Sequence, residues 1–362
     1  MEALELILCM LAVSAAFDLV ARRLSIPLPS LLVLGGLVLA IIPGLPRAEL
    51  PPDLVFLIFV PPLVYWAALT IPFQDFRDNI RAITLLGVGL VLATMAVIAV
   101  TAHALIPGLP WNSSFVLGAI ISPPDVIAVT AVTRRLKIPQ VISTILEGEG
   151  LVNDATAFVV YRMAVTAVVA GSFSLWQAGF KFIWTAALGV GIGLVAGWLI
   201  GKLRWLVGRA PLVENTISLL TPYAVFIPAE RLGLSSVLAV ATTGLYLSRQ
   251  NPRITSAETR IQAHSMWEIL NFLLEGLIFI MIGLELPRIG RAVGNYSLRS
   301  LTWYVLVLSA VLIVVRIAWM FPGAYLPRLI RRRLLQKRDQ YPSWRGVLFA
   351  GWAGVRGADS LV

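Results

Sequence analysis

Three carboxylates lie within eight residues of one apolar stretch, in the run Glu147-Gly-Glu149-Gly-Leu-Val-Asn153-Asp154. A charged side chain inside a membrane span is costly, and it normally faces a partner, a cavity or an ion pathway. Glu147 and Asp154 are seven residues apart and share one helix face, whereas Glu149 points elsewhere and needs its own partner. A carboxylate can hold a proton or, when ionised, a small alkali cation. The spacing therefore singles out Asp154 as a group that could bind either one in turn.

A second polar group is Ser122-Pro123-Pro124-Asp125. Two adjacent prolines remove two backbone donors and predict a break in the helix. Broken helices at membrane depth are tolerated only where they are buried in protein or line a cavity. Asp125 would begin the second half-helix, where the positive end of the helix dipole favours a carboxylate. Two interpretations stay open: Asp125 helps to coordinate an ion at the level of Asp154, or it only caps the half-helix.

Two arginines also lie where charge is costly. Arg316 is in the middle of the stretch Leu-Ile-Val-Val-Arg-Ile-Ala. We expect it to pair with Glu149, with Glu275 or a backbone carbonyl as the alternatives. Arg356 and Gly357 lie in Gly-Val-Arg-Gly-Ala, which predicts a second broken helix. A matched pair of interrupted spans is typical of a transport site.

The elements that hold these groups are predicted from the composition. The chain has 362 residues, of which 58% are hydrophobic and 13% charged. Soluble domains carry about 25% charged residues, so the composition excludes an ordinary soluble domain, and it also excludes disorder. It predicts an all-α, multi-pass membrane protein. The predicted spans are 3–21, 27–43, 52–70, 82–106, 114–133, 139–170, 176–201, 212–230, 234–248, 264–287, 299–322 and 344–362.

Orientation follows from the loops. The loops after the odd-numbered spans hold 19 Lys and Arg, against 5 in the loops after the even-numbered spans. The positive-inside rule therefore predicts that the N-terminus lies outside a plasma membrane. This distribution also explains the net charge of +10 without a nucleic-acid partner.

Several other patterns limit the chemistry. The single Cys9 and two histidines exclude an internal disulfide and a zinc site. No nucleophile, metal cluster or phosphate loop is visible, so we expect neither an enzyme nor a cofactor. Glu230 and Arg231 are expected to form a pair at the membrane interface. A stripe of small residues in span 176–201 predicts a close helix contact. Its members are Gly189, Gly191, Gly193 and Gly197.

Together these motifs resemble the monovalent cation:proton antiporter family, specifically its bacterial sodium/proton exchangers related to the animal exchangers. Ser122–Val129 is similar to the family's S-P-T-D-P-V-A-V, and Ile145–Ala155 to its I-L-E-G-E-S-L-L-N-D-A. Pro61–Leu63 is similar to L-P-P-L, and Trp267 with Phe279–Leu284 to a further family segment. Arg316 and the glycine-flanked Arg356 match two family arginines. The resemblance runs from the third span to the end of the chain.

The resemblance implies a thirteen-helix fold of two inverted six-helix repeats, with a dimerisation part, a mobile core and two broken crossing helices. The chain would show twelve of these spans, as one transmembrane exchanger domain over 1–362 that is incomplete at its C-terminus, in a homodimer. The resemblance also implies that Asp154 carries the exchanged ion. Asn153 beside it marks the electroneutral branch, and Asp125 lies where the broken helices cross. Glu149 and Arg316 would pair to hold the core.

Four departures from the family pattern leave the choice of cation open. Gly150 replaces a serine, Pro124 replaces a threonine, Trp66 replaces a common carboxylate, and Asp359 replaces a small apolar residue. The resemblance implies an electroneutral exchange of sodium for protons by alternating access, with no partner other than these ions, the bilayer and a second copy. The alternatives are an antiporter that prefers potassium or lithium, and a channel-like or non-transporting relative.

Overall fold

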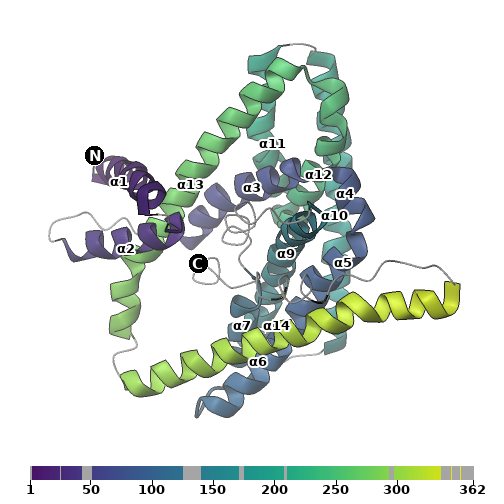
Figure 1. Cartoon of the computed structure of the whole chain (residues 1–362). Coiled ribbons are helices and arrows are strands. Elements are labelled where there is room, and N and C mark those ends of the chain that lie inside the picture. The colour runs from purple at the N-terminus through teal and green to yellow at the C-terminus, as the bar shows by residue number, and fades with distance from the viewer. Residues whose placement is uncertain are drawn as a thin grey trace.

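The structure is a computed structural model that describes residues 2–24, 26–42, 51–124, 140–170, 175–207, 210–292 and 297–335, with Trp344 and Gly351. Every regular element within these ranges is a helix (Figure 1). The elements are α1 (Glu2–Leu24), α2 (Leu28–Ile41), α3 (Pro52–Thr70), α4 (Phe73–Asp78), α5 (Ile80–Thr84), the π-helix η1 (Leu85–Leu90), α6 (Val91–Leu105), α7 (Trp111–Ile121), α9 (Gln140–Ala170), α10 (Leu175–Val207), α11 (Pro211–Arg231), α12 (Ser236–Ile254), α13 (Ala257–Ala292) and α14 (Leu298–Leu335).

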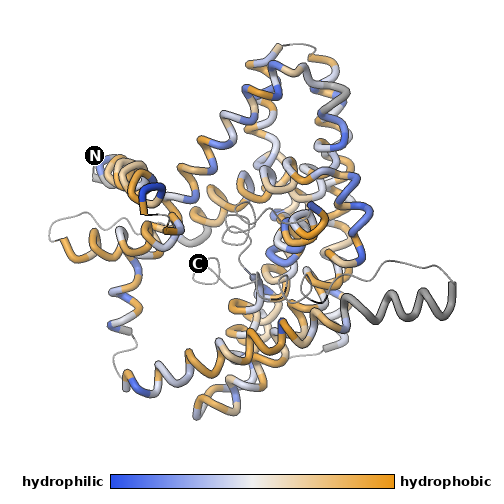
Figure 2. Tube along the Cα trace, viewed as in Figure 1, coloured by the Kyte–Doolittle hydropathy of each residue, from blue (hydrophilic) through white to orange (hydrophobic). Residues whose placement is uncertain are grey.

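Helices lie on eleven of the twelve predicted spans, and the span 344–362 lies largely outside the described residues. Within the described residues, five helical segments are long and apolar enough to cross a membrane. They are Ile80–Leu105, Gln140–Val169, Ala178–Val207, Ala257–Arg291 and Leu298–Pro322. Large apolar side chains are exposed along α10 and α14, as expected for surfaces that contact lipid (Figure 2).

The predicted end of the span 299–322 is wrong. The apolar pattern ends near residue 322 and predicts that the helix ends there. Instead α14 continues to Leu335. Leucine and arginine are good helix formers, and cations are favourable near the C-terminal end of a helix. The helix therefore continues beyond its apolar part.

Glycines set two close helix contacts. At the crossing of α2 and α13, a Cβ on Gly36 would lie 2.1 Å from the Ile280 carbonyl oxygen, and one on Gly283 would lie 2.2 Å from that of Val33. The contact between α10 and α12 uses three of the four predicted glycines, at positions 189, 193 and 197. The prediction is wrong for Gly191, which has no neighbour within 4 Å. Gly191 is two residues from Gly189 and from Gly193, so it points to the opposite side of α10.

α9 lies between two groups of helices, and α13 packs mainly on α2 and α1. In one of the two groups, α12 packs on α3, α10 and α11 around a core that includes Val225, Phe226 and, from α13, Trp267. In the other, α6 packs on η1, α7 and α14, and η1 and α7 also pack on α9. α9 touches both groups: its Ala155 lies in the core of the first. The run of carboxylates is thus on the helix that joins the two groups.

Candidate functional site

The helix that leads to the double proline ends where the sequence predicts a break. α7 stops at Ile121, and Ser122, Pro123 and Pro124 are not helical. The hydroxyl of Ser122 donates back to the Ala119 carbonyl at 3.1 Å. Asp125 and the rest of the predicted second half-helix lie outside the described residues.

Asn153 links α9 to this break. Its Nδ2 donates to the Pro124 carbonyl at 3.2 Å, and the side chain is fully buried. Its Oδ1 is buried without a hydrogen-bond partner. A buried acceptor in this state costs about 1–3 kcal/mol. The structure therefore holds an amide oxygen beside the break that is free to bind a cation or a donor.

Asp154 differs from its two neighbours. Asn153 and Ala155 are fully buried, whereas Asp154 is exposed. Successive residues of a helix point about 100° apart, so Asn153 faces Pro124 while Asp154 faces the open side of α9. Of the three carboxylates in the run, Asp154 is the most accessible to a mobile ion.

Glu149 and Arg316 form a two-point ion pair between α9 and α14. Nη1 lies 2.7 Å from one carboxylate oxygen and Nη2 lies 3.1 Å from the other. Arg316 Nε donates to the Gly351 carbonyl at 3.1 Å. The two side chains are only 1% and 5% exposed. Of the three partners that the sequence left open, the structure brings two to this arginine: Glu149 and a backbone carbonyl.

The π-helix η1 packs on α9 beside Asn153. The sequence did not reveal this element. A Cβ on Gly87 would lie 2.7 Å from that of Val152 and 3.2 Å from the backbone nitrogen of Asn153. Trp319 of α14 donates its indole N–H to the Leu85 carbonyl at 3.3 Å. Single π turns inside α-helices are frequent at functional sites. No local pattern in the apolar run predicts this π turn.

A second ion pair joins α9 to the other group of helices. Arg162 Nη2 bonds to Glu230 of α11, and Ser236 of α12 donates to the second oxygen of Glu230 at 2.7 Å. The predicted pair of Glu230 with Arg231 is therefore wrong. Adjacent residues on a helix point apart, and Glu230 faces α9 instead.

A third ion pair is buried at the ends of α10, α11 and α12. Arg204 Nη2 lies 3.6 Å from Glu214, and the two side chains are 6% and 1% exposed. Arg204 also donates to Asn251 at 2.9 Å and to Thr255 at 3.1 Å. The apolar pattern ends at 201 and therefore predicts that Arg204 lies in a loop. α10 in fact continues to Val207, and the arginine faces inward.

The sequence profile of the sodium/hydrogen exchanger transmembrane domain matches residues 8–362. The chain belongs to the sodium/hydrogen exchanger family. It is 34% identical to an uncharacterised Na⁺/H⁺ exchanger of Mycobacterium tuberculosis, over 99% of this chain and 66% of that protein. It is 33% identical to the sodium, potassium, lithium and rubidium/H⁺ antiporter of Bacillus subtilis, over 100% of this chain and 55% of that protein. The chain thus spans two thirds of these relatives or less.

Solved exchanger structures show the same fold. The sodium proton antiporter MjNhaP1 of Methanocaldococcus jannaschii superposes with a TM-score of 0.70 at 21% identity, covering 100% of this chain and 85% of that one. The family consists of transporters rather than enzymes. Together with the apolar helices, membership of this family indicates a multi-pass membrane protein.

One departure from the family pattern has a visible packing role. Trp66 of α3 stacks on Trp267 with ring centroids 5.9 Å apart, and it meets the ring of His264 at a tilted angle with centroids 5.2 Å apart. In this chain the position of the common carboxylate is thus filled by an aromatic contact between α3 and α13. Asp359, like Arg356 and Gly357, lies outside the described residues.

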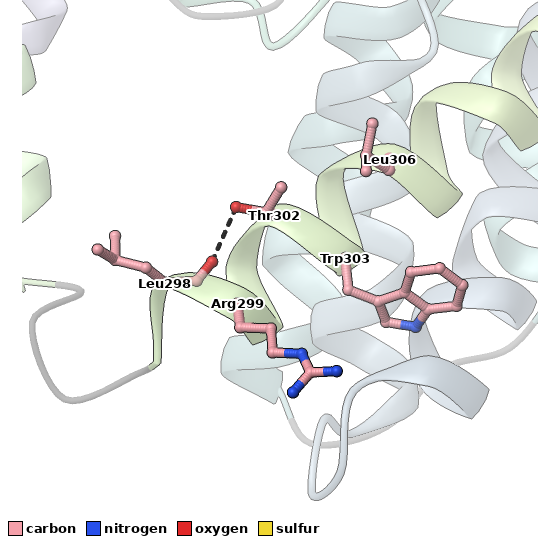
Figure 3. A pocket seen from close by; sticks show the side chains of 5 residues that line it. All are labelled: Leu298, Arg299, Thr302, Trp303 and Leu306. Carbon is pink, nitrogen blue, oxygen red and sulfur yellow. Dashed lines mark hydrogen bonds between the residues drawn. The ribbon is translucent and has the colours of Figure 1, made fainter.

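A pocket on α14 lies apart from the run of carboxylates on α9. Five residues of this one helix line it, namely Leu298, Arg299, Thr302, Trp303 and Leu306 (Figure 3). The hydroxyl of Thr302 donates to the Leu298 carbonyl at 2.8 Å, so it is already used within the helix. No residue of α9 contributes to the pocket. Among the described residues, no three His, Cys, Asp or Glu side chains are grouped to hold a metal ion.

Proposed function

We propose that this protein exchanges sodium ions for protons across the membrane, with Asp154 as the shared carrier. The observation that carries the proposal is the buried Asn153 Oδ1, which lacks a donor, beside the exposed carboxylate of Asp154. An amide oxygen and a carboxylate on adjacent residues supply ligands for a small cation. Asp125, at the helix break, would supply another. The sodium/hydrogen exchanger family supports the choice of ions.

Two carboxylates of the run are bonded to side chains that suit a structural role. Glu149 is bonded at both oxygens to Arg316. Glu147 accepts a hydrogen bond from Ser143 at 3.0 Å. The guanidinium of Arg316 neutralises the buried charge of Glu149, which favours a role for Glu149 in holding α9 to α14 rather than in carrying an ion.

The proposed cycle is a one-for-one exchange. Asp154 releases a proton on one side, binds a cation, crosses with the core and releases the cation for a proton on the other side. One positive charge moves each way, so the membrane potential does not drive the exchange and the two concentration gradients do. Asn153 fits this electroneutral cycle because it adds no second negative charge at the site.

The proposed architecture is that of the family resemblance. It has twelve spans within 1–362 and a thirteenth beyond them, in two inverted repeats with broken helices at Pro123-Pro124 and at Arg356-Gly357. The N-terminus is outside a bacterial inner membrane, and the protein is a homodimer. Glu149 and Arg316 hold the core in this proposal, and the region 1–362 is one exchanger domain.

The cation is the least constrained part of the proposal. The Bacillus subtilis relative is named for sodium, potassium, lithium and rubidium. In this chain Gly150 and Pro124 carry no side-chain oxygen, so fewer hydroxyl ligands are available than in the family pattern. An antiporter with a preference for potassium or lithium is therefore the second candidate.

The test is exchange in proteoliposomes that contain a pH-sensitive dye. Addition of sodium, lithium or potassium should move protons, and the rate should be the same at clamped potentials of either sign. Asp154→Asn should abolish exchange, whereas Asp18→Asn, which breaks an exposed pair with Arg22 on α1, should not. No proton movement with any of the cations would refute antiport, and normal exchange in Asp154→Asn would refute the carrier assignment.

A further inference from the structure

The face of α9 that carries Asp154 continues toward the C-terminal end of the helix with Phe158 and Arg162. These residues are four and eight positions further along and therefore lie on one side of the helix. With a rise of 1.5 Å per residue, Arg162 is about 12 Å from Asp154 along the axis. A path that follows this face of α9 from Asp154 to that end of the helix passes these two side chains.

Phe158 fills the space between α9 and two helices of the other group. Its ring stacks on Phe56 of α3 at 4.3 Å between centroids, with an angle of 14° between the planes. Phe56 in turn contacts Phe226 of α11 at 5.5 Å. The three rings come from three helices and form a continuous apolar layer, which a hydrated ion cannot cross without losing its water.

Arg162 covers this layer on the side away from Asp154. Its guanidinium carbon lies 4.4 Å from the centre of the Phe158 ring. The same guanidinium bonds to Glu230, which also accepts from Ser236. The pair is partly exposed, with 45% of the Arg162 side chain and 29% of that of Glu230 accessible. One arginine thus connects the aromatic layer, α11 and α12.

The contact lies at the seam between the two groups of helices. On its other side, α9 is held by the buried pair with Arg316 and by Gly87 of η1. On the side of Phe158 and Arg162, it meets α3, α11 and α12, which pack mainly on one another. If α9 moves together with η1, α6, α7 and α14, the contacts that must separate are the Phe158 layer and the Arg162–Glu230 pair.

We propose that Phe158, Arg162 and Glu230 form a seal that closes the path between Asp154 and the C-terminal end of α9. Phe158 excludes water from the path. The Arg162–Glu230 pair holds α9 against α11. The distribution of Lys and Arg places this end of α9 outside the membrane, so in this structure Asp154 is closed to the outside. The inference rests on the proposed function for its purpose, because a carrier needs such a barrier on one side at a time.

The test measures access to position 154 rather than transport. In a Cys9→Ser background, Asp154→Cys is the reporter, and a membrane-impermeant thiol reagent is applied to right-side-out and to inside-out vesicles. With the seal intact, labelling should be slow from the outside and fast from the inside. Adding Glu230→Gln, Arg162→Gln or Phe158→Ala should accelerate outside labelling at least tenfold. Glu230→Gln keeps the shape of the side chain, so it guards against loss of the fold in Phe158→Ala.

The matched control is Arg22→Gln, which breaks the exposed Asp18–Arg22 pair on α1 and should leave the labelling rate unchanged. Equal outside labelling in all variants, or fast labelling from the outside before any seal residue is changed, overturns the seal. Because the reporter needs no ion exchange, a seal can be found even if antiport fails. Absence of exchange in the chain that keeps Asp154, together with an intact asymmetry of labelling in the Asp154→Cys reporter, would refute the proposed function alone.

Discussion

Two ion pairs on one helix differ in burial and in how completely they are bonded. The Glu149–Arg316 pair is nearly inaccessible, and every guanidinium nitrogen donates a hydrogen bond. The Arg162–Glu230 pair is open to solvent on one side. A buried pair is costly to break because the remaining charge stays in a medium of low dielectric, whereas an exposed charge is solvated by water. The difference favours two kinds of contact between helices. The first joint, Glu149–Arg316, is buried and permanent, and the second joint, Arg162–Glu230, can open.

The location of each pair agrees with this difference. Arg316 ties α9 to the group formed by η1, α6, α7 and α14, whereas Glu230 ties it to the group of α3, α10, α11 and α12. A rearrangement that keeps the first joint and opens the second would move α9 together with η1, α6, α7 and α14. Asp154 lies between the two joints and would change its surroundings with each such step.

The largest expected effect is on the buried joint. Glu149→Gln and Arg316→Gln should each lower the free energy of unfolding by about 3–5 kcal/mol, because each leaves a buried charge without its partner. The double variant should cost less than the sum, since both changes remove the same pair. Unfolding in a mild detergent, followed by thermal melts and denaturant titration, gives these values. Additive losses would show that the two residues act separately.

A smaller loss is expected from filling the contact that positions Asn153. Gly87→Val should lower stability by roughly 1–3 kcal/mol, because the new methyl groups overlap Val152 and force α9 away from η1. Gly191→Val is the matched control, since Gly191 has no neighbour within 4 Å. Detergent melts of both variants measure the difference. Equal losses in the two would mean that helix propensity, rather than this contact, sets the cost.

The Arg204–Glu214 pair tests whether burial or hydrogen bonding sets the contribution of an ion pair to the free energy of unfolding. Glu214 is as buried as Glu149, but its nearest Arg204 nitrogen is 3.6 Å away and its Oε2 has no hydrogen-bond partner. Glu214→Gln should therefore cost less than Glu149→Gln, about 1–2 kcal/mol, because Arg204 keeps Asn251 and Thr255 as acceptors. The same unfolding titration compares the two variants. A loss equal to that of Glu149→Gln would show that burial alone determines the energy.

Some of these contacts could be predicted because a charge within an apolar stretch needs a partner. Others could not, because their residues have water as an alternative or depend on packing. Charges in the middle of apolar stretches are few, so Arg316 had a short list of partners and Glu149 was among them. Arg162 and Glu230 lie toward helix ends, where water offers an alternative and the sequence does not single out a partner. Arg204 was assigned to a loop because hydropathy marks the apolar part of a helix and not its end. The π turn at Gly87 depends on packing against α9 that no local pattern encodes.

The smallest stability effect is expected at the seam. Glu230→Gln should change the free energy of unfolding by less than about 1 kcal/mol, because a partly exposed pair contributes little and both residues can be solvated. The effect should shrink further in high salt, which screens exposed charges and hardly affects buried ones. Melts of Glu230→Gln and Glu149→Gln at low and high salt provide the comparison. A loss at Glu230 as large as that at Glu149, and insensitive to salt, would mean that both joints are permanent. In that case α9 could not part from α11 during exchange, and motion between the two groups would need a different seam.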